Sequence, residues 1–215
     1  MPKRYIPNDA WSRKAAKDGY RARSVYKLME IDERFRLLKS GQTVLDLAAA
    51  PGSWLQYVSK RIGPKGLVIG FDLQPIKPIA GNVVTFQADI TDTKAVNTLL
   101  QEHVKQQTSQ ASLTSATSPT FNIILSDIAP STSGIRDVDQ WRSIELNQAV
   151  LDIASRWLRT GGSCVLKVFR GADFDAFLRE VKADWKDVKI VNPRASRDRS
   201  REVYIVMKKP TTIKP

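Results

Sequence analysis

Short apolar runs alternate with longer helix-like segments along most of this 215-residue sequence, and the alternation limits the folds open to the chain. Each run is bounded by turn residues and has the length of a buried strand. The runs are Thr43–Leu47, Leu67–Phe71, Val83–Phe86, Phe121–Leu125, Ser163–Phe169, Val188–Val191 and Val203–Met207, and the segments that favour helix are Trp54–Arg61, Lys94–Val104, Val138–Leu158 and Asp173–Val181. Strands alternating with helices predict an α/β fold, in which helices cover both faces of a mostly parallel sheet.

The last two apolar runs are too close together for a parallel connection. Only about ten residues separate them, which is shorter than the crossover that joins parallel strands. We therefore expect a hairpin, with a seventh strand that runs antiparallel to the rest of the sheet.

Residues 106–120 interrupt the pattern before the fourth run. Their sequence, QQTSQASLTSATSPT, carries no charge and has few large apolar side chains, so we expect an inserted flexible loop. With this insertion inside it, a single domain over residues 23–209 is predicted, preceded by a basic arm at 1–22 and followed by a tail at 210–215.

Positive charge is concentrated at the N-terminal end. The chain has 34 Lys and Arg against 22 Asp and Glu, a formal net charge of +12, and residues 1–27 hold eight of the basic side chains but only two acidic ones. Clustered Lys and Arg neutralise phosphates, and Tyr and Trp side chains interleaved with them can stack on bases. Nucleic acid is therefore the predicted partner, with an acidic lipid surface as the alternative. The candidate nucleic-acid contacts are Arg13, Lys14, Arg23 and, in a second basic cluster near the C-terminus, Arg197.

Composition excludes several classes of site. The single cysteine, Cys164, cannot form an internal disulfide, and the single histidine, His103, cannot build a His-rich metal centre, so no metal is expected. No apolar stretch approaches the length of a membrane span, and the N-terminal residues lack the apolar segment of a secretory signal. We expect a cytoplasmic protein that does not enter membranes.

The most informative local motif runs from Val44 to Trp54. A strand ends close to an acid, Asp46, small residues follow, and a helix begins near Ser53. Small residues let a ligand approach the backbone, and the start of a helix offers unpaired N–H groups. The carboxyl ends of strands in such a sheet are where ligands bind. The alternative is a tight strand-to-helix turn without a ligand.

Two more acids follow the next two strands. Asp72 ends the second strand, 20 residues beyond Gly52, at the position where an acid binds the hydroxyls of an adenosine ribose. Asp89 follows the third strand, where its side chain can reach an adenine amino group. A nicotinamide cofactor is the rival interpretation, but the first turn lacks the G-x-G-x-x-G pattern that holds a pyrophosphate. S-adenosylmethionine, which has none, fits better.

The fourth and fifth strands end in a predicted charge pair. Lys167 lies within an apolar strand, where an unpaired lysine is costly to bury. Asp127, at the end of the adjacent strand, supplies the carboxylate that it needs. The alternative is a lysine on an edge strand whose ammonium group extends to the surface.

Five motifs, in order along the chain, closely resemble the FtsJ/RrmJ-type 2′-O-ribose RNA methyltransferases. They are Arg23–Leu28, Asp46–Trp54, Ser126–Pro130, Leu166–Gly171 and Ser200–Tyr204, and the resemblance spans roughly residues 10–208. It implies a Rossmann-like, class I S-adenosylmethionine-dependent methyltransferase fold with seven strands, of which the last is antiparallel. The sequence departs from the family pattern at Ala48, Ser53 and Ser131.

The resemblance also implies the site. A catalytic Lys-Asp-Lys-Glu tetrad maps onto Lys27, Asp127, Lys167 and Glu202. The implied contacts with S-adenosylmethionine are Gly52, Trp54, Asp72, Asp89 and Asp127, with Asp46 supporting the methionine end.

The implied reaction is attack of a ribose 2′-oxygen of RNA on the sulfonium methyl, with Lys167 as general base or alkoxide stabiliser. The compact chain is most similar to the members that methylate a uridine of 23S rRNA in the large (50S) ribosomal subunit, and tRNA is the alternative substrate. A methyltransferase of small molecules or proteins, and a non-catalytic RNA-binding protein, compete with this hypothesis. We expect a monomer.

Overall fold

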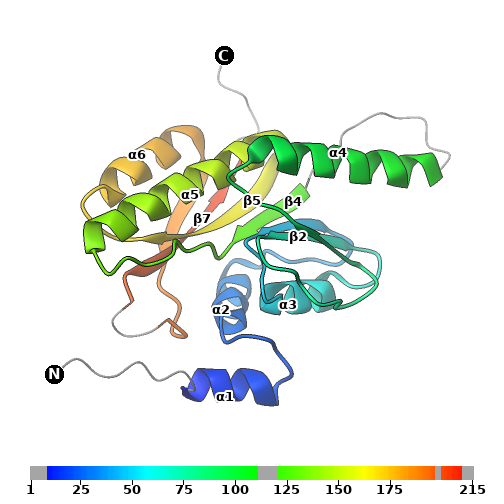
Figure 1. The fold of residues 1–215 in the computed structure, drawn as a ribbon, viewed down its shortest axis with the longest axis horizontal. Coiled ribbons are helices and arrows are strands. Elements are labelled where there is room, and N and C mark those ends of the chain that lie inside the picture. The colour runs from blue at the N-terminus through cyan, green and yellow to red at the C-terminus, as the bar shows by residue number, and fades with distance from the viewer. Residues whose placement is uncertain (1–8, 111–120, 197–199, 210–215) are drawn as a thin grey trace.

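A seven-stranded sheet forms the centre of the computed structural model, which describes residues 9–110, 121–196 and 200–209 (Figure 1). The strands within these residues are β1 Thr43–Leu47, β2 Leu67–Asp72, β3 Val83–Gln87, β4 Phe121–Ser126, β5 Leu158–Phe169, β6 Lys186–Val191 and β7 Glu202–Lys208. Their spatial order is β3-β2-β1-β4-β5-β7-β6. The order reverses between β1 and β4, which is the point where open α/β sheets bind ligands.

The direction of the strands agrees with the sequence prediction. Strands β1 to β5 pair in parallel, and β7 is antiparallel to both of its neighbours, β5 and β6. The predicted hairpin with an antiparallel last strand is confirmed. As a result, the first residue of β7 lies at the same edge of the sheet as the carboxyl ends of the parallel strands.

Helices cover both faces of the sheet, because each helix has one apolar stripe to bury. The helices are α1 Ala10–Lys17, α2 Val25–Phe35, α3 Ser53–Ile62, α4 Thr93–Gln110, α5 Arg136–Trp157 and α6 Phe174–Asp184. One buried cluster joins α2 and α3 to one face, through Leu28 and Leu55. The other joins α4, α5 and α6 to the opposite face, through residues such as Val150 and Phe177 (Figure 1). Within the described residues, no helix has the length and apolarity needed to cross a membrane.

Helix α1 is packed onto the domain. Asp9 caps its N-terminus by accepting a hydrogen bond from the Ser12 N–H at 2.9 Å. Trp11 lies 5.2 Å from the Tyr26 ring, centroid to centroid, and Ala15 is buried in a small cluster with Val25. The described part of the predicted basic arm is therefore a docked helix, while the domain boundary at residue 22 stays a prediction.

Two predicted boundaries are wrong. Helix α4 continues to Gln110, so residues 106–110 of the predicted loop are helical, and residues 111–120 lie outside the described part of the chain. The stretch from Thr93 to Gln110 contains no Gly or Pro, and glutamine favours helix, so the helix propagates although its end is polar. Strand β5 begins at Leu158 instead of Ser163, because Leu158 pairs with Phe121 across an irregular register.

Candidate active site

Strand alternation places three polar side chains on the face of the sheet that α2 and α3 cover: Lys167, Tyr204 and Glu202. Val165 packs with the α2 and α3 cluster, and Leu166 packs on the opposite face, so Lys167 faces α2. Lys167 is directly paired with Tyr204 in the antiparallel register of β5 and β7. Glu202 lies two residues before Tyr204 and therefore shares its face.

The four predicted tetrad residues form two ion pairs at this position. Lys27, in the first turn of α2, pairs with Glu202. The Lys167 Nζ lies 3.0 Å from the Asp127 Oδ1 and donates a hydrogen bond to the Asp127 carbonyl oxygen at 2.6 Å. The side chains are between 8% and 19% exposed, so the pairs are shielded from water but can be reached from one side. The structure brings these four side chains together, and their catalytic role stays a prediction.

Tyr204, for which the sequence pattern predicted no role, links the two ion pairs. Its hydroxyl donates to the Asp127 Oδ1 at 2.6 Å, and the Lys27 Nζ lies 5.8 Å from the centre of its ring. Burial, and the nearby charges of Asp127 and Glu202, raise the pKa of Tyr204 well above its ordinary value, so it remains a donor. The available sequence signal was its spacing of two residues from Glu202 on one strand.

Helix α5 fixes the backbone beneath Lys167. The side-chain amide of Asn147 donates to the Lys167 carbonyl at 2.8 Å, and the Phe169 N–H donates to the Ser143 hydroxyl at 3.1 Å. Both side chains are buried. The end of β5 is therefore held to α5 on one side, while Lys167 projects to the other.

Asp46 has the most unusual environment among the described residues. It is 1% exposed, and neither of its carboxylate oxygens has a hydrogen-bond partner in the described part of the protein. Burial raises the pKa of the Asp46 carboxyl well above its ordinary value, and the charges of Asp127 and Asp72 raise it further. A buried carboxylate without a protein partner is a candidate site for a cationic or hydrogen-bonding ligand.

The turn after β1, which begins two residues beyond Asp46, has two residues with positive φ. Ala48 has a positive φ of 66°, a conformation that costs a side-chain-bearing residue about 1–2 kcal/mol and that is concentrated at functional sites. Gly52 has a φ of 99° and forms the N-cap of α3. The first N–H groups of a helix have no partner within it, so α3 presents donors to an anionic group at this turn.

Trp54 does not contribute its side chain to the crevice. The ring is 3% exposed, its Nε1 donates to the Ser24 carbonyl at 2.9 Å, and it packs against Tyr204. A contact between Trp54 and a cofactor is therefore restricted to its backbone N–H, in the first turn of α3.

Asp72 and Asp89 lie where strand order predicted. The Asp72 carboxylate accepts from the N–H groups of Ala50 and Gln74, both at 2.8 Å, and thereby joins the end of β2 to the turn after β1. Asp89 is exposed and accepts from the N–H and the hydroxyl of Thr91. Both acids stabilise turns, and both lie at the ligand-binding edge of the sheet.

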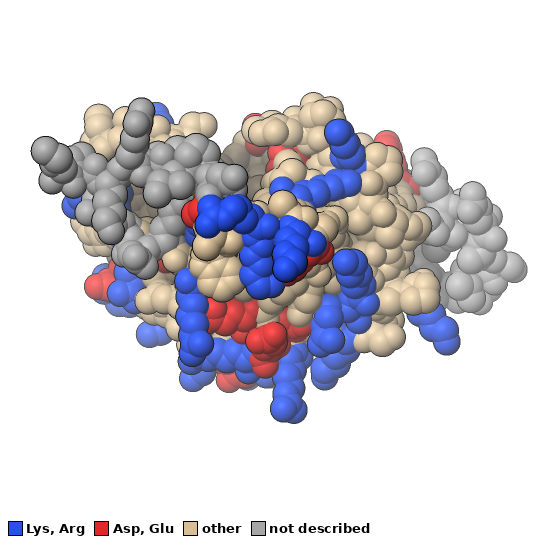
Figure 2. Space-filling model, turned by 90° about the horizontal axis from the view of Figure 1, so that it is seen from below, with Lys and Arg blue, Asp and Glu red and all other residues tan. Residues whose placement is uncertain are grey.

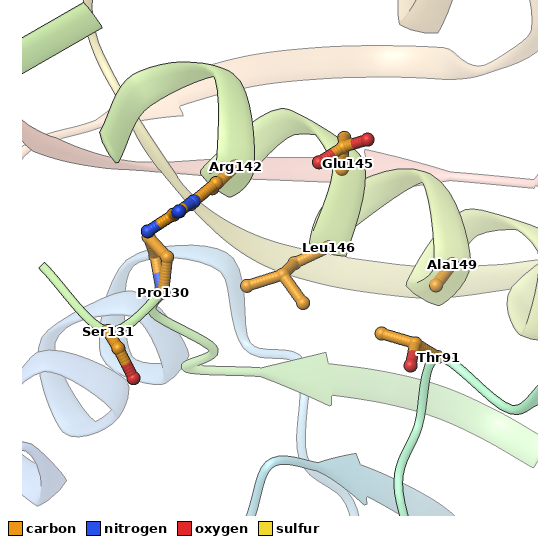
Figure 3. A pocket seen from close by; sticks show the side chains of 7 residues that line it. All are labelled: Thr91, Pro130, Ser131, Arg142, Glu145, Leu146 and Ala149. Carbon is orange, nitrogen blue, oxygen red and sulfur yellow. The ribbon is translucent and has the colours of Figure 1, made fainter. Parts of the chain in front are cut away.

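A pocket of about 520 Å³ lies between helix α5 and the loops that follow β3 and β4 (Figure 3). Its apolar wall is formed by Pro130, Leu146 and Ala149, and its polar rim by Thr91, Ser131, Arg142 and Glu145. Thr91 follows Asp89 by two residues, and Pro130 follows Asp127 by three. Thr91 donates to the Asp89 carboxylate, so the pocket lies beside Asp89.

The four candidate RNA contacts differ in their surroundings. Arg13 and Lys14 are exposed on α1, where Lys14 pairs with Asp18, and Lys and Arg side chains spread widely over this face (Figure 2). Arg23 is engaged within the protein: it pairs with Asp9 and donates to the Ala195 carbonyl at 2.5 Å. Arg197 lies outside the described residues.

The two residue types that the composition singled out are part of the scaffold. Burial raises the pKa of the Cys164 thiol far above its ordinary value, as expected for a core residue. His103 is half-buried, with its ring 5.9 Å from that of Phe86. In the described ranges, no group of His, Cys, Asp or Glu side chains is arranged to hold a metal ion.

Comparison with known proteins agrees with this geometry. Residues 20–210 match the model of the FtsJ-like methyltransferase family. A relative from Syntrophobacter fumaroxidans, named ribosomal RNA large subunit methyltransferase E, is 43% identical over 94% of this chain and 95% of its own. A relative of the same name from Bdellovibrio bacteriovorus is 42% identical over 94% and 96%. The crystal structure of a protein from Plasmodium falciparum, described as a ribosomal RNA methyltransferase, superposes with a TM-score of 0.73 at 25% identity, over 90% of this chain and 100% of that one. The chain therefore belongs to the FtsJ-like methyltransferase family.

Proposed function

We propose that the protein transfers a methyl group from S-adenosylmethionine to a ribose 2′-oxygen of RNA, and that the target is a uridine of 23S rRNA in the large ribosomal subunit. Two relatives that match nearly the whole chain are named large-subunit ribosomal RNA methyltransferases, which supports the substrate. A ribosomal substrate places the enzyme in the cytoplasm, and we propose that it acts there as a monomer.

The observation that carries the proposal is the meeting of two lysine–carboxylate pairs beside an unpartnered buried carboxylate. The Lys167–Asp127 pair and the Lys27–Glu202 pair lie at the edge of the sheet where β1 and β4 end. Asp46, on the strand adjacent to β4, is buried without a hydrogen-bond partner in the described part of the chain. A binding crevice for a cation therefore adjoins a group of charges suited to an oxyanion.

The residues present fit S-adenosylmethionine, which supplies an electrophilic methyl group on a sulfonium when it is bound. Asp46 would accept from the ammonium of its methionine end, and the first N–H groups of α3 would hold its carboxylate. Asp72 would bind the ribose hydroxyls, and Asp89 the adenine amino group, next to the pocket rimmed by Thr91.

The tetrad would act on the RNA ribose. The Lys167 ammonium has three N–H donors; it donates to the Asp127 carbonyl and pairs with the Asp127 carboxylate, and a remaining N–H would donate to the 2′-oxygen. This donor would stabilise the negative charge that develops on the 2′-oxygen as the hydroxyl proton is released to solvent water. Lys27, held by Glu202, would add a second positive charge, and the rest of catalysis would come from aligning the 2′-oxygen with the methyl group.

Tyr204→Phe is expected to lower kcat by about 10-fold to 100-fold with little change in the KM for the cofactor. The phenylalanine keeps the ring packing against Trp54 but removes the hydrogen bond to the Asp127 carboxylate, and such a bond to a charged group contributes about 1.5–3 kcal/mol. Steady-state kinetics at saturating RNA separate the two parameters. A normal kcat in this variant would show that Tyr204 does not position Asp127.

Loss of Arg13 and Lys14 is expected to weaken RNA binding and to flatten its salt dependence. Each phosphate contact on single-stranded RNA contributes about 0.7 to the slope of the logarithm of the binding constant against the logarithm of salt concentration. The magnitude of this slope should therefore be smaller by about 1.4 in the double alanine variant. The measurement is RNA affinity across a salt series. Arg179→Ala is the control, because Arg179 is exposed on α6, at the opposite end of the molecule from α1 (Figure 1). An unchanged slope in the double variant would remove α1 from the RNA interface.

The position of the methyl group tests the proposed reaction. RNA treated with the enzyme and S-adenosylmethionine is digested with alkali, which cannot cleave the bond after a 2′-O-methylated ribose. An alkali-resistant dinucleotide that carries the new methyl group supports ribose methylation. A methyl group recovered on a free mononucleotide base contradicts it.

A further inference from the structure

Arg21 belongs by sequence to the basic N-terminal segment, yet its guanidinium points into the protein's own backbone. Its Nη1 donates to the Pro51 carbonyl at 3.0 Å and to the Lys77 carbonyl at 2.8 Å, and its Nη2 donates to the Pro78 carbonyl at 2.8 Å. One planar group thus joins two loops, the turn after β1 and the connection between β2 and β3. The fork of an arginine fixes such an arrangement, because its donors keep a rigid relative geometry.

A second set of bonds holds the backbone at Arg21 in place. The Arg21 N–H donates to the Gln56 Oε1 at 2.9 Å, and the Gln56 side-chain amide donates to the Gly19 carbonyl at 3.1 Å. Gln56 lies on α3, one turn after the residues whose N–H groups face the cofactor crevice. The segment that follows α1 is therefore attached to α3 as well as to the two loops.

These loops close tightly over Gly52. A Cβ placed on Gly52 would lie 2.9 Å from the Ile79 Cδ1, 3.0 Å from the Arg21 Nη1 and 3.1 Å from the Ile76 Cγ2. The β2–β3 connection therefore packs directly on the N-cap of α3, and Arg21 lies within this contact. A larger residue at position 52 has no space.

The two loops that Arg21 joins carry the proposed cofactor contacts. The β2–β3 connection begins immediately after Asp72, and the Asp72 carboxylate holds the Ala50 N–H at 2.8 Å. The turn after β1 contains the N-cap of α3. A shift of one loop relative to the other would move the proposed ribose-binding acid away from the amides that face the methionine end.

We infer that Arg21 is a positioning residue for the cofactor crevice and not a phosphate contact. By holding the turn after β1 to the β2–β3 connection, it sets the spacing between Asp72 and the start of α3. This inference rests on the proposed use of S-adenosylmethionine, but not on the identity of the RNA.

The test measures binding of S-adenosylhomocysteine, the demethylated product, to the full-length protein by calorimetry in the absence of RNA. Arg21→Ala is expected to weaken this binding by about tenfold or more, because small misplacements of binding groups are costly. Arg21→Lys keeps the charge but not the fork, so its affinity should lie between those of Arg21→Ala and the wild type. Arg34→Ala, which removes an exposed arginine on α2, is the matched control and should bind as the wild type does.

Two further measurements separate positioning from phosphate binding and from loss of folding. Turnover of Arg21→Ala should return close to the wild-type value at saturating S-adenosylmethionine, so that the defect lies in KM. Its affinity for RNA without cofactor should match that of Arg34→Ala. If Arg21→Ala were misfolded, it would show neither normal turnover at saturating S-adenosylmethionine nor normal RNA affinity. If loss of folding were the cause, Arg21→Lys would not show an intermediate affinity for S-adenosylhomocysteine.

The outcomes are distinguishable. Wild-type affinity for S-adenosylhomocysteine in Arg21→Ala, or a loss of RNA affinity that Arg21→Lys restores, would overturn the positioning role and leave the proposed function intact. A wild-type protein that binds no S-adenosylhomocysteine would overturn both. Weakened binding in Arg21→Ala supports the positioning role even if the wild-type enzyme methylates an RNA other than ribosomal RNA.

Discussion

Lys167→Ala is expected to lower methyl transfer by about 1,000-fold, because it removes the N–H donor that we propose for the 2′-oxygen, in a site shielded from water. Cofactor affinity should stay close to that of the wild type. Asp127 keeps its hydrogen bond from the Tyr204 hydroxyl at 2.6 Å, so its carboxylate remains in place when the lysine is removed. The effect should therefore appear in kcat at saturating S-adenosylmethionine.

Single-turnover kinetics together with calorimetric binding of S-adenosylhomocysteine measure the two quantities. Lys167→Met is a useful companion, since it fills the space of the lysine stem without its charge, and it should be as inactive as Lys167→Ala. Lys189→Ala, on the exposed face of edge strand β6, is the control for loss of one lysine. Wild-type turnover in Lys167→Ala would refute the role given to Lys167.

Asp46→Asn is expected to stabilise the protein at neutral pH and to abolish most of its cofactor affinity. Burial of an unpartnered carboxylate costs about 1–3 kcal/mol, and the amide carries no charge to desolvate. The same substitution removes the charge that would accept from the ammonium of the cofactor, so binding should weaken by about 10-fold to 100-fold. Stability and binding should thus change in opposite directions.

The pH dependence of this stabilisation follows from the direction of the pKa shift. Because the pKa of Asp46 is raised in the folded protein, the folded state keeps a proton that the unfolded state has already released. Stability contributed by the protonated form is therefore lost as pH rises from the ordinary pKa of an aspartate through the raised value. The stability gain of Asp46→Asn should be largest at pH 8 and should shrink as pH approaches 4.

Chemical denaturation at several pH values, with Asp175→Asn on the exposed side of α6 as control, tests this prediction. Calorimetry with S-adenosylhomocysteine measures the second predicted effect, the loss of cofactor affinity. Lower stability of Asp46→Asn at pH 8, combined with unchanged affinity, would show that Asp46 has a structural partner and no part in binding.

Much of the fold and part of the site could be predicted, because segments that are buried in the fold have recognisable patterns of apolar residues in the sequence. Each strand from β1 to β5 contains an apolar run, and the short distance between β6 and β7 indicated their hairpin. The Lys167–Asp127 pair followed from the cost of burying an unpaired lysine, and the structure contains that pair. Patterns of this kind depend only on local residues and on strand order.

The roles of several charged residues could not be predicted. The sequence does not show whether an arginine is exposed to solvent or hydrogen-bonded within the protein. Arg21 and Arg23 belong to the same basic segment as Arg13, but their guanidinium groups bond to carbonyls 30 to 172 residues away along the chain. The Trp54 side chain is buried and its Nε1 donates to the Ser24 carbonyl, so the contact of Trp54 with the cofactor stays a prediction for its backbone. Each of these outcomes depends on tertiary packing that no local pattern records.

The central claim is tested most directly by transfer of radiolabelled methyl groups from S-adenosylmethionine to RNA. Large ribosomal subunits, naked 23S rRNA and bulk tRNA are offered in parallel, with Lys167→Ala as the inactive control. Label on the large subunit that disappears with Lys167→Ala is the predicted result. Label on tRNA alone, or equal label with the wild type and Lys167→Ala, would contradict the account.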